Sequence, residues 1–428
     1  MTITRPAVRA HRRRNAPRHI QSLLCLLAIV AISTSSSALA ALSSQLLTRV
    51  DSLLQAQVGA GKIAGAVVQI NHNGQVVKSL AVGMQDREAG IPMSTSTIFR
   101  IASQTKAIVS AAVMILQERG ALVISDPVGR YLPEYTHTSV AVATEEGGYD
   151  VVPAKRPITI RDLLTHTAGI GYGRGIAADR WEQARMQGWY FAHRNERMRE
   201  TVRRMAALPF DAQPGERFVY GYNTDILGAL VEAVSGQKLS DFLAQHIFAP
   251  LGMSDTHFYL PADKAHRLAV VYGTDDDGQL VRAPDTSDMR GQGEYTSGPR
   301  MSYSGGAGLL STASDYARFL EAMRGGGSLN GHRLLGRKSV QLMTVDHLDS
   351  IDYRPGMGFG LGFSVVEDLG ARGFMGSVGT FAWGGAYHTT YWVDPAEDLV
   401  VTYMTQLIPA RDADDQTKLR TAIYGAIE

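Results

Sequence analysis

The pattern of apolar and polar positions predicts strands soon after the start of the chain, followed by a long helix. Two apolar runs, Gly65–Ile70 and Gln75–Val82, are joined through Asn73-Gly74, the strongest short signal for a β-hairpin. A helix is predicted from Ser103 to Arg119, because Gly120 follows as a suitable residue to end it. The N-terminal region therefore combines strands and helices.

The remainder of the chain first becomes helical and then returns to strands. The clearest further predicted helices are 44–58, 159–164, 225–234, 313–323 and 415–427, and the later predicted strands are 360–366, 389–393 and 399–405. Strand-rich ends around a helical middle predict one α/β domain made of residues 41–120 and 330–428. A mainly helical domain, residues 121–329, would be inserted in it, with the active site in the cleft between them.

The first 40 residues have the pattern of a signal peptide. Basic residues from Arg5 to Arg18 precede an eleven-residue apolar run, Ser22–Ile32, and small residues precede a cleavage position after Ala40. We therefore expect an exported protein, periplasmic or secreted, with no stable membrane association after cleavage. Cys25, the only cysteine, lies in this segment, so the mature chain would have no thiol catalysis, disulfide or cysteine metal site.

Composition and charge exclude several classes of function. The 428 residues are 45% hydrophobic and 19% charged, which is typical of a globular chain and not of a disordered one. The formal net charge is +1, but residues 1–40 hold six arginines and no acidic residue, so the rest carries 36 basic and 41 acidic residues. A mildly acidic body predicts no nucleic-acid partner.

Metal and phosphate chemistry is not indicated by any motif. None of the twelve histidines lies three or four positions from another, and the sequence contains neither a phosphate-binding loop motif nor a Gly-x-Ser-x-Gly motif. We therefore expect no metal and no cofactor. The oligomeric state stays open.

A serine and a lysine remain as candidates for catalysis. Lys106 is the only charged residue in the stretch Ile101–Leu116, in a chain with eight lysines and 34 arginines. Ser103 precedes it by three positions, which places both side chains on one face of a helix. A lysine desolvated at a helix N-terminus is pushed towards its neutral form and can then take a proton from a serine hydroxyl.

The same pair also has a simpler interpretation. In this interpretation Ser103 serves only as the N-cap of the helix, and the stem of Lys106 packs on apolar surface with its charge in water. A second Ser-x-x-Lys sequence, Ser235-Gly236-Gln237-Lys238, shows how weak the motif is by itself. Because that copy follows a predicted helix and includes Gly236, a suitable residue to end a helix, we assign it to a polar helix end.

The sequence around Ser103 resembles a known nucleophile motif. Ile101–Lys106 is similar to that of the serine β-lactamase and penicillin-binding-protein superfamily, and most similar to the class C β-lactamases and family VIII carboxylesterases. Four more segments resemble signatures of this family in the same order: 158–171, 214–228, 305–310 and 381–395. The resemblance implies a β-lactamase-like fold, an antiparallel sheet flanked by helices with an inserted all-helical domain.

The resemblance also assigns roles to individual residues. Ser103 would be the acylated nucleophile, Lys106 its proton partner, and Tyr220 a general base and then acid. The backbone N–H groups of Ser103 and Ala386 would form the oxyanion hole. His166 would belong to a loop that supports the cleft.

Two positions depart from the β-lactamase pattern. Trp383-Gly384-Gly385 stands where β-lactamases have Lys-Thr-Gly, and the two glycines would let an acyl group lie along the strand. Tyr222 stands where the family usually has an asparagine, and it is either a substrate-contacting or a core aromatic. An indole lacks the charge that helps to hold a substrate carboxylate, so the change at Trp383 favours uncharged esters.

The resulting hypothesis is a serine hydrolase that acts through an acyl-enzyme. The preferred activity is a carboxylesterase on short-acyl esters, with weak β-lactam hydrolysis left open, and the partner is a small-molecule ester or β-lactam. A class C-type β-lactamase or a D-amino-acid peptidase is the first alternative. Trp383 and Tyr222 argue against it, but another cation such as Arg372 could reach the cleft. A penicillin-binding sensor that is acylated without turnover is the second.

Overall fold

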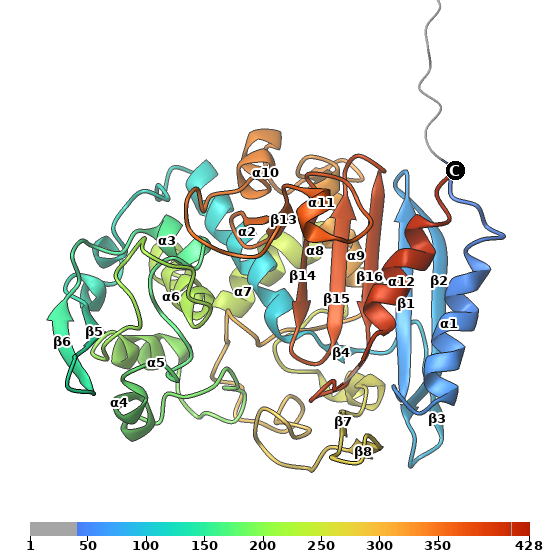
Figure 1. Cartoon of the computed structure of the whole chain (residues 1–428), viewed down its shortest axis with the longest axis horizontal. Coiled ribbons are helices and arrows are strands. Elements are labelled where there is room, and N and C mark those ends of the chain that lie inside the picture. The colour runs from blue at the N-terminus through green and yellow to red at the C-terminus, as the bar shows by residue number, and fades with distance from the viewer. Residues whose placement is uncertain (1–40, 412) are drawn as a thin grey trace, which may run out of the picture. The chain divides into compact units, whose positions relative to one another are not determined.

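An antiparallel sheet of eight strands organises the chain (Figure 1). The computed structural model describes residues 41–411 and 413–428. In spatial order, the strands are β12 (Met357–Phe359), β13 (Ser364–Val366), β14 (Phe381–Gly385), β15 (Thr389–Asp394), β16 (Leu399–Met404), β1 (Gly65–His72), β2 (Gln75–Asp86) and β3 (Ile91–Pro92). Strands from both ends of the sequence therefore lie in one sheet, as the apolar pattern predicts.

The two ends meet at the pairing of β1 with β16. Val67 lies opposite Met404 in this antiparallel ladder, and every residue of β1 is buried. Successive side chains of a strand point to opposite faces. Accordingly, Val67 belongs to the core on one face of the sheet, whereas Val68 belongs to the core on the other. This strand needs cover on both faces.

Helices supply that cover. On one face α1 (Thr48–Gly59) packs against α12 (Asp415–Tyr424), and on the other α9 (Ala313–Arg324) packs against β1 and β16 (Figure 1). The long buried helix α2 (Thr105–Glu118) follows β4 (Phe99–Arg100) and packs against α6. The core thus forms around α2 as well as around the sheet.

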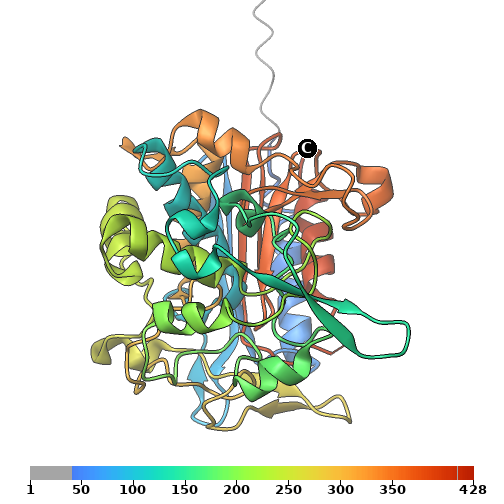
Figure 2. The same ribbon diagram turned by 90° about the vertical axis from the view of Figure 1, so that its left-hand side faces the viewer.

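The middle of the chain is mainly helical and also carries hairpins (Figure 2). Its α-helices are α3 (Ile160–Leu164), α4 (Ala178–Gln183), α5 (Met198–Met205), α6 (Asn223–Ser235), α7 (Leu239–Leu243) and α8 (Ala249–Leu251). Two hairpins, which the sequence analysis does not predict, pair β5 (Ser139–Ala143) with β6 (Tyr149–Pro153) and β7 (Tyr272–Thr274) with β8 (Leu280–Arg282). The remaining short elements are β9 (Leu310–Ser311), β10 (Ser328–Leu329), β11 (His332–Arg333), α10 (Arg337–Met343) and α11 (Leu369–Arg372).

One predicted strand is divided in two. The apolar run 360–366 continues only as β13, because residues 360–363 form a turn between β12 and β13. Gly362 adopts φ +95° there, and a side chain at this position would collide with Ser110 on α2. The close approach of this turn to α2 therefore interrupts the strand.

The other sequence-based expectations have different outcomes. The β1–β2 hairpin and the helices α1, α2, α6, α9 and α12 are confirmed, with ends shifted by a few residues. The predicted signal peptide and Cys25 lie outside the described residues. The boundaries at 120 and 330 between two domains stay a prediction, although α9, from the middle segment, packs on the sheet. In the described part of the chain, no helix is long and apolar enough to cross a membrane.

Replacing a core residue of α2 tests how much this helix contributes to the fold. The Ile108 side chain is fully buried, so Ile108→Ala should lower the free energy of unfolding by about 2–5 kcal/mol, because it leaves a cavity. Urea denaturation followed by circular dichroism measures this change. The control Val76→Ala removes a side chain that is 57% exposed and should change the stability by no more than about 0.5 kcal/mol.

Candidate active site

Ser103 lies in a tight turn at the start of the buried helix. The turn is one 3-10 element, η1 (Ala102–Gln104), between β4 and α2. Ala102 adopts φ +42°, a left-handed conformation that is rare for residues other than glycine and is often found at functional sites. Ser103 emerges from this turn into a cavity of about 950 Å³. The backbone therefore presents the serine to solvent at the end of an otherwise buried helix.

Lys106 is buried directly behind this serine. The lysine is 1% exposed, and its Nζ donates hydrogen bonds to Ser103 Oγ at 3.3 Å, Tyr172 OH at 3.1 Å and the Gly306 carbonyl at 2.8 Å. An ammonium group has three N–H donors, so each has an acceptor. Lys106 forms no direct ion pair within the described residues, although its charge favours the ionised form of the buried Asp225 carboxylate.

Asp225 acts on Lys106 through the Gly306 loop. Its Oδ1 accepts hydrogen bonds from Ser304 Oγ at 2.6 Å and from the Gly306 N–H at 3.0 Å. A side chain at Gly306 would collide with the Asp225 carboxylate. Burial raises the pKa of Asp225, although the hydrogen bond from Ser304 acts in the opposite direction. The carboxylate thus fixes the carbonyl that orients the lysine.

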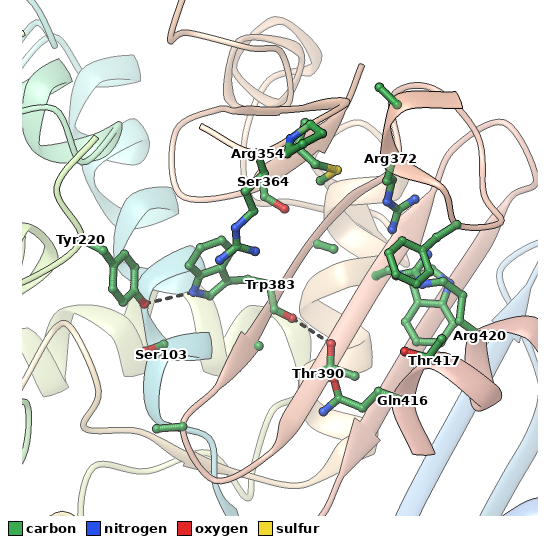
Figure 3. A pocket seen from close by; sticks show the side chains of 18 of the residues that line it. Ser103, Tyr220, Arg354, Ser364, Arg372, Trp383, Thr390, Gln416, Thr417 and Arg420 are labelled. Carbon is green, nitrogen blue, oxygen red and sulfur yellow. Dashed lines mark hydrogen bonds between the residues drawn. The ribbon is translucent and has the colours of Figure 1, made fainter. Parts of the chain in front are cut away.

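Tyr220 lies on the other side of Lys106. The lysine Nζ is 4.6 Å from the centre of the Tyr220 ring, and Trp383 Nε1 donates a hydrogen bond to the tyrosine hydroxyl at 3.1 Å (Figure 3). The structure therefore brings Ser103, Lys106, Tyr220 and Trp383 together, as the resemblance implies. Because the tyrosine oxygen accepts a hydrogen bond from the indole N–H, its own O–H can point towards a substrate.

His166 supports Tyr220 from behind. The two rings are 4.6 Å apart, and His166 Nδ1 lies 2.9 Å from the Asn223 amide nitrogen. Burial lowers the pKa of His166 well below its usual range, and the charge of Lys106 adds to this effect. A buried neutral imidazole packed against Tyr220 agrees with a supporting loop residue.

Strand β14 lies close to the turn that carries the serine. A side chain at Gly385 would collide with the Ile101 carbonyl, so only glycine permits this approach. Trp383, Gly384 and Ala386 line the cavity. Within the described residues, the N–H groups of Ser103 and Ala386 donate no hydrogen bond to the protein, and they remain available for an oxyanion.

The turn after β14 is held in place from α12. His388 Nε2 lies 2.7 Å from Asp415 Oδ1, and the Gln416 amide donates to the His388 carbonyl at 3.0 Å. The Tyr403 hydroxyl donates a further hydrogen bond to Asp415. Because Ala386 belongs to this turn, these contacts fix the position of its N–H group.

Tyr222 does not reach the cavity. Its side chain is fully buried, and its hydroxyl donates to the carbonyls of Met186 at 3.0 Å and Gly188 at 2.6 Å. The ring stacks on Trp181 at 5.7 Å. Of the two interpretations, the structure therefore supports the core aromatic, and the assignment of Tyr222 to substrate binding is corrected.

Several cavity residues were missed by the sequence analysis. Tyr172 lines the cavity and accepts from Lys106, and burial raises its pKa well above the usual range, so it stays protonated. Its neighbours Gly171 and Gly173 are the only sequence signal of a tight loop there. The cavity lining also includes Trp189, Arg354 and Arg420, which were likewise missed, and Arg372, the cation that the sequence analysis considered able to reach the cleft. In the described part of the chain, no cluster of three side chains is suited to hold a metal ion.

Comparison with protein-family models identifies the family to which this sequence belongs. The family model described as Beta-lactamase matches residues 50–424. The chain belongs to the beta-lactamase family. This membership confirms the resemblance of the Ser103 segment to serine β-lactamases and penicillin-binding proteins.

Individual relatives of this beta-lactamase family member cover most of its length. Protein Rv1367c of Mycobacterium tuberculosis is 35% identical over 85% of this chain and 93% of its own length. Esterase EstB of Burkholderia gladioli is 32% identical over 92% of this chain and its own full length. Lovastatin esterase of Penicillium rubens is 29% identical over 86% of this chain and 95% of its own length.

Solved structures confirm the predicted fold class. EstCE1, described as a hydrolase with promiscuous acyltransferase activity, superimposes with a TM-score of 0.76 at 29% identity, covering 89% of this chain and 99% of its own. A penicillin-binding protein from Bacillus halodurans has a TM-score of 0.63 at 20% identity, covering 87% and 98%, a similarity of fold alone. The β-lactamase-like fold, with its antiparallel sheet flanked by helices, is thereby established.

The hydrogen bond between Trp383 and Tyr220 can be tested by one substitution. Trp383→Phe keeps an aromatic ring and removes the Nε1 donor, and a neutral hydrogen bond contributes about 1 kcal/mol. The rate of acylation of Ser103 by p-nitrophenyl acetate should therefore fall roughly fivefold. Stopped-flow release of p-nitrophenol measures this rate.

A matched tryptophan provides the control. Trp181 Nε1 donates to the Pro209 carbonyl at 2.9 Å and lies outside the cavity lining. Trp181→Phe should lower the stability by about 1 kcal/mol and leave the acylation rate unchanged. An unchanged rate in Trp383→Phe would contradict a role for this hydrogen bond in acylation.

Proposed function

We propose that this protein is a serine hydrolase that cleaves carboxylic esters through an acyl-enzyme on Ser103. The decisive observation is the Lys106 Nζ, buried 3.3 Å from Ser103 Oγ and 4.6 Å from the Tyr220 ring. Nucleophilic catalysis explains why a lysine would be placed in an apolar helix next to an accessible serine. The simpler interpretation, a lysine stem packed on apolar surface with its charge in water, does not agree with a side chain that is 1% exposed.

The reaction follows from the positions of these groups. Ser103 Oγ attacks the ester carbonyl, and its proton passes to Lys106 or Tyr220 while the carbonyl oxygen gains the negative charge. The N–H groups of Ser103 and Ala386 would hold that oxyanion. When the tetrahedral intermediate collapses, the carbon–oxygen bond to the alcohol breaks, and Tyr220 returns a proton to the departing oxygen. Water then attacks the Ser103 ester and releases the acid.

The nature of Trp383 supports an ester as the preferred substrate. An indole offers an N–H, which here bonds to Tyr220, and no positive charge for a carboxylate beside the reacting bond. The printed names of two relatives, Esterase EstB and Lovastatin esterase, describe esterases. A small-molecule ester with a short acyl chain is therefore the proposed substrate, without a cofactor. We also propose that residues 1–40 direct export of the chain.

The first experiment compares two chromogenic substrates under pre-steady-state conditions. The wild-type chain should turn over p-nitrophenyl butyrate many times and hydrolyse a chromogenic cephalosporin much more slowly. Ser103→Ala should lower the esterase rate by at least about a thousandfold, because it removes the nucleophile. Lys106→Met should also lower the rate strongly, since it removes the amine that lies 3.3 Å from Ser103 Oγ and takes part in the proton transfer.

The second Ser-x-x-Lys sequence supplies matched controls. Ser235 Oγ donates to the Val231 carbonyl at 2.6 Å at the end of α6, and Lys238 is exposed. Ser235→Ala and Lys238→Met should leave the rate unchanged. Full activity of Ser103→Ala would contradict the assignment of the nucleophile. A faster reaction with the cephalosporin would favour a β-lactamase, and a burst of one equivalent with both substrates would favour a sensor.

A further inference from the structure

The cavity passes around the edge of β14 onto the other face of the sheet. β13 pairs only with Phe381 and Ala382, so residues 383–385 of β14 form an open edge. Trp383 points towards Tyr220, whereas Ala382 and Gly384, on the opposite face, line the cavity together with Trp392 of β15. The cavity therefore has two lobes, one at Ser103 and a second one beside α12 (Figure 3).

Two arginines line the second lobe. Arg420 comes from α12, and Arg372 comes from the end of α11. Among the described residues, neither side chain forms an ion pair, and the Nη1 atom of each is buried without a hydrogen-bond partner, although Arg420 also interacts with the Tyr424 hydroxyl. The described cavity lining as a whole contains three arginines and no acidic residue. Burial lowers the pKa of both arginines, and the charge of Asp394 opposes this effect. Asp394 forms no ion pair with either among the described residues, so the second lobe keeps guanidinium N–H groups that the protein leaves unpaired.

The local packing orients Arg420 without using its hydrogen-bonding capacity. Its guanidinium carbon is 4.3 Å from the centre of the Trp392 ring and 5.8 Å from that of Tyr424. Such stacking fixes the plane of a guanidinium group and leaves its N–H donors free. Burial lowers the pKa of Arg420 to about 10; Tyr424 opposes this effect and the charge of Arg372 reinforces it. At neutral pH the side chain is still protonated.

The nearest carboxylate is already committed to other donors. Asp394 Oδ2 accepts from Thr380 Oγ1 at 3.0 Å and from Tyr424 OH at 2.8 Å. Its Oδ1 accepts from the backbone N–H groups of Ala396 at 3.1 Å and Glu397 at 3.4 Å. A buried N–H donor without a hydrogen-bond partner is costly to maintain, and each arginine has one at Nη1, so a structural role alone does not explain the arginine pair.

The strand register gives the separation of the two lobes along the direction of β14. Gly385 lies against Ile101, next to Ser103, while Ala382 pairs with Trp392, under Arg420. Three residues of a strand span about 10 Å. An acyl chain that starts at the serine and passes around the open edge of β14 to Arg420 must span at least this length, which corresponds to an extended chain of about eight carbons.

We propose that the arginine pair, Arg372 and Arg420, binds a carboxylate at the far end of the acyl group, so that monoesters of medium-chain dicarboxylic acids are favoured substrates. This inference rests on the proposed esterase function, and it replaces the short acyl chain proposed there by a longer one that ends in a carboxylate. It names a substrate feature that the Trp383 position alone does not suggest, because Arg372 and Arg420 lie in the other lobe. Guanidinium groups recognise carboxylates with charge-assisted, often bidentate, hydrogen bonds.

The test compares two esters that differ in one terminal group. Mono-p-nitrophenyl suberate carries a terminal carboxylate, and p-nitrophenyl octanoate has an uncharged chain of the same length. In wild type, kcat/KM should favour the suberate ester by about tenfold or more, since hydrogen bonds to charged groups are strong. Arg420→Gln and Arg372→Gln should each reduce this preference several-fold, mainly through KM, while the rate with the octanoate ester shows that the variants are folded.

Two further arginines provide comparisons. Arg130, whose side chain is 64% exposed, lies outside the cavity lining, and Arg130→Gln should keep the full preference. Arg354 lies 5.7 Å from the Trp383 ring centre at the other part of the cavity. A preference that is lost only in Arg354→Gln would place the carboxylate there and overturn the assignment to the second lobe. No preference in wild type, or one unchanged in both Arg372 and Arg420 variants, would also overturn it.

A binding measurement separates this inference from the esterase hypothesis. Titration calorimetry of free suberate with Ser103→Ala protein requires no turnover. Binding that is weakened in the double variants Ser103→Ala/Arg420→Gln and Ser103→Ala/Arg372→Gln would support the subsite even if neither ester were hydrolysed by wild type. Failure of hydrolysis would then concern only the proposed function, whereas absence of suberate binding would overturn the subsite.

Discussion

The burial of one lysine determines how the rest of this site is organised. Lys106 lies inside α2, and the protein gives its Nζ three neutral acceptors and an aromatic face in place of a carboxylate. The charge of Lys106 interacts with the buried Asp225 carboxylate without a direct ion pair, and Nζ lies 3.3 Å from Ser103 Oγ. This position is suited to the exchange of a proton with the serine hydroxyl. The Gly306 loop, fixed by Asp225, makes this environment possible.

The fold serves the site by bringing distant segments within contact of Ser103. The serine and β14 are separated by more than 270 residues, and only the sheet that joins both ends of the chain brings them together. The collision that a side chain at Gly385 would cause shows how closely β14 approaches the serine turn. The same strand ends in an open edge, which gives the cavity access to both faces of the sheet. The strand order therefore decides the shape of the cavity as well as the position of the oxyanion donors.

The sequence predicts those parts of the site that depend on local chemistry. Lys106 can be recognised as the only charge in an apolar helix, and Ser103 as its neighbour on one face. Tyr220 and Trp383 could be found only by resemblance to a family, since nothing local distinguishes them from core aromatics. Tyr222 shows the limit of assigning roles by resemblance. It stands where the family usually has a substrate-contacting asparagine, but its side chain lies in the core, where its hydroxyl donates hydrogen bonds to two carbonyls. Tyr172 and Arg420 reach the cavity through tertiary packing, which no local pattern encodes. For the same reason the turn at Gly362, caused by contact with α2, could not be predicted from the apolar run.

The central claim is that Lys106 activates Ser103 for acylation, and a direct chemical measurement can test it. Wild-type protein is mixed with p-nitrophenyl butyrate, quenched in acid within the first turnover, digested and analysed by peptide mass spectrometry. The account predicts a butyryl group on Ser103 in wild type, and a much slower appearance of that group in Lys106→Met. A butyryl group on another residue, or acylation of Ser103 at the wild-type rate without Lys106, would contradict the account.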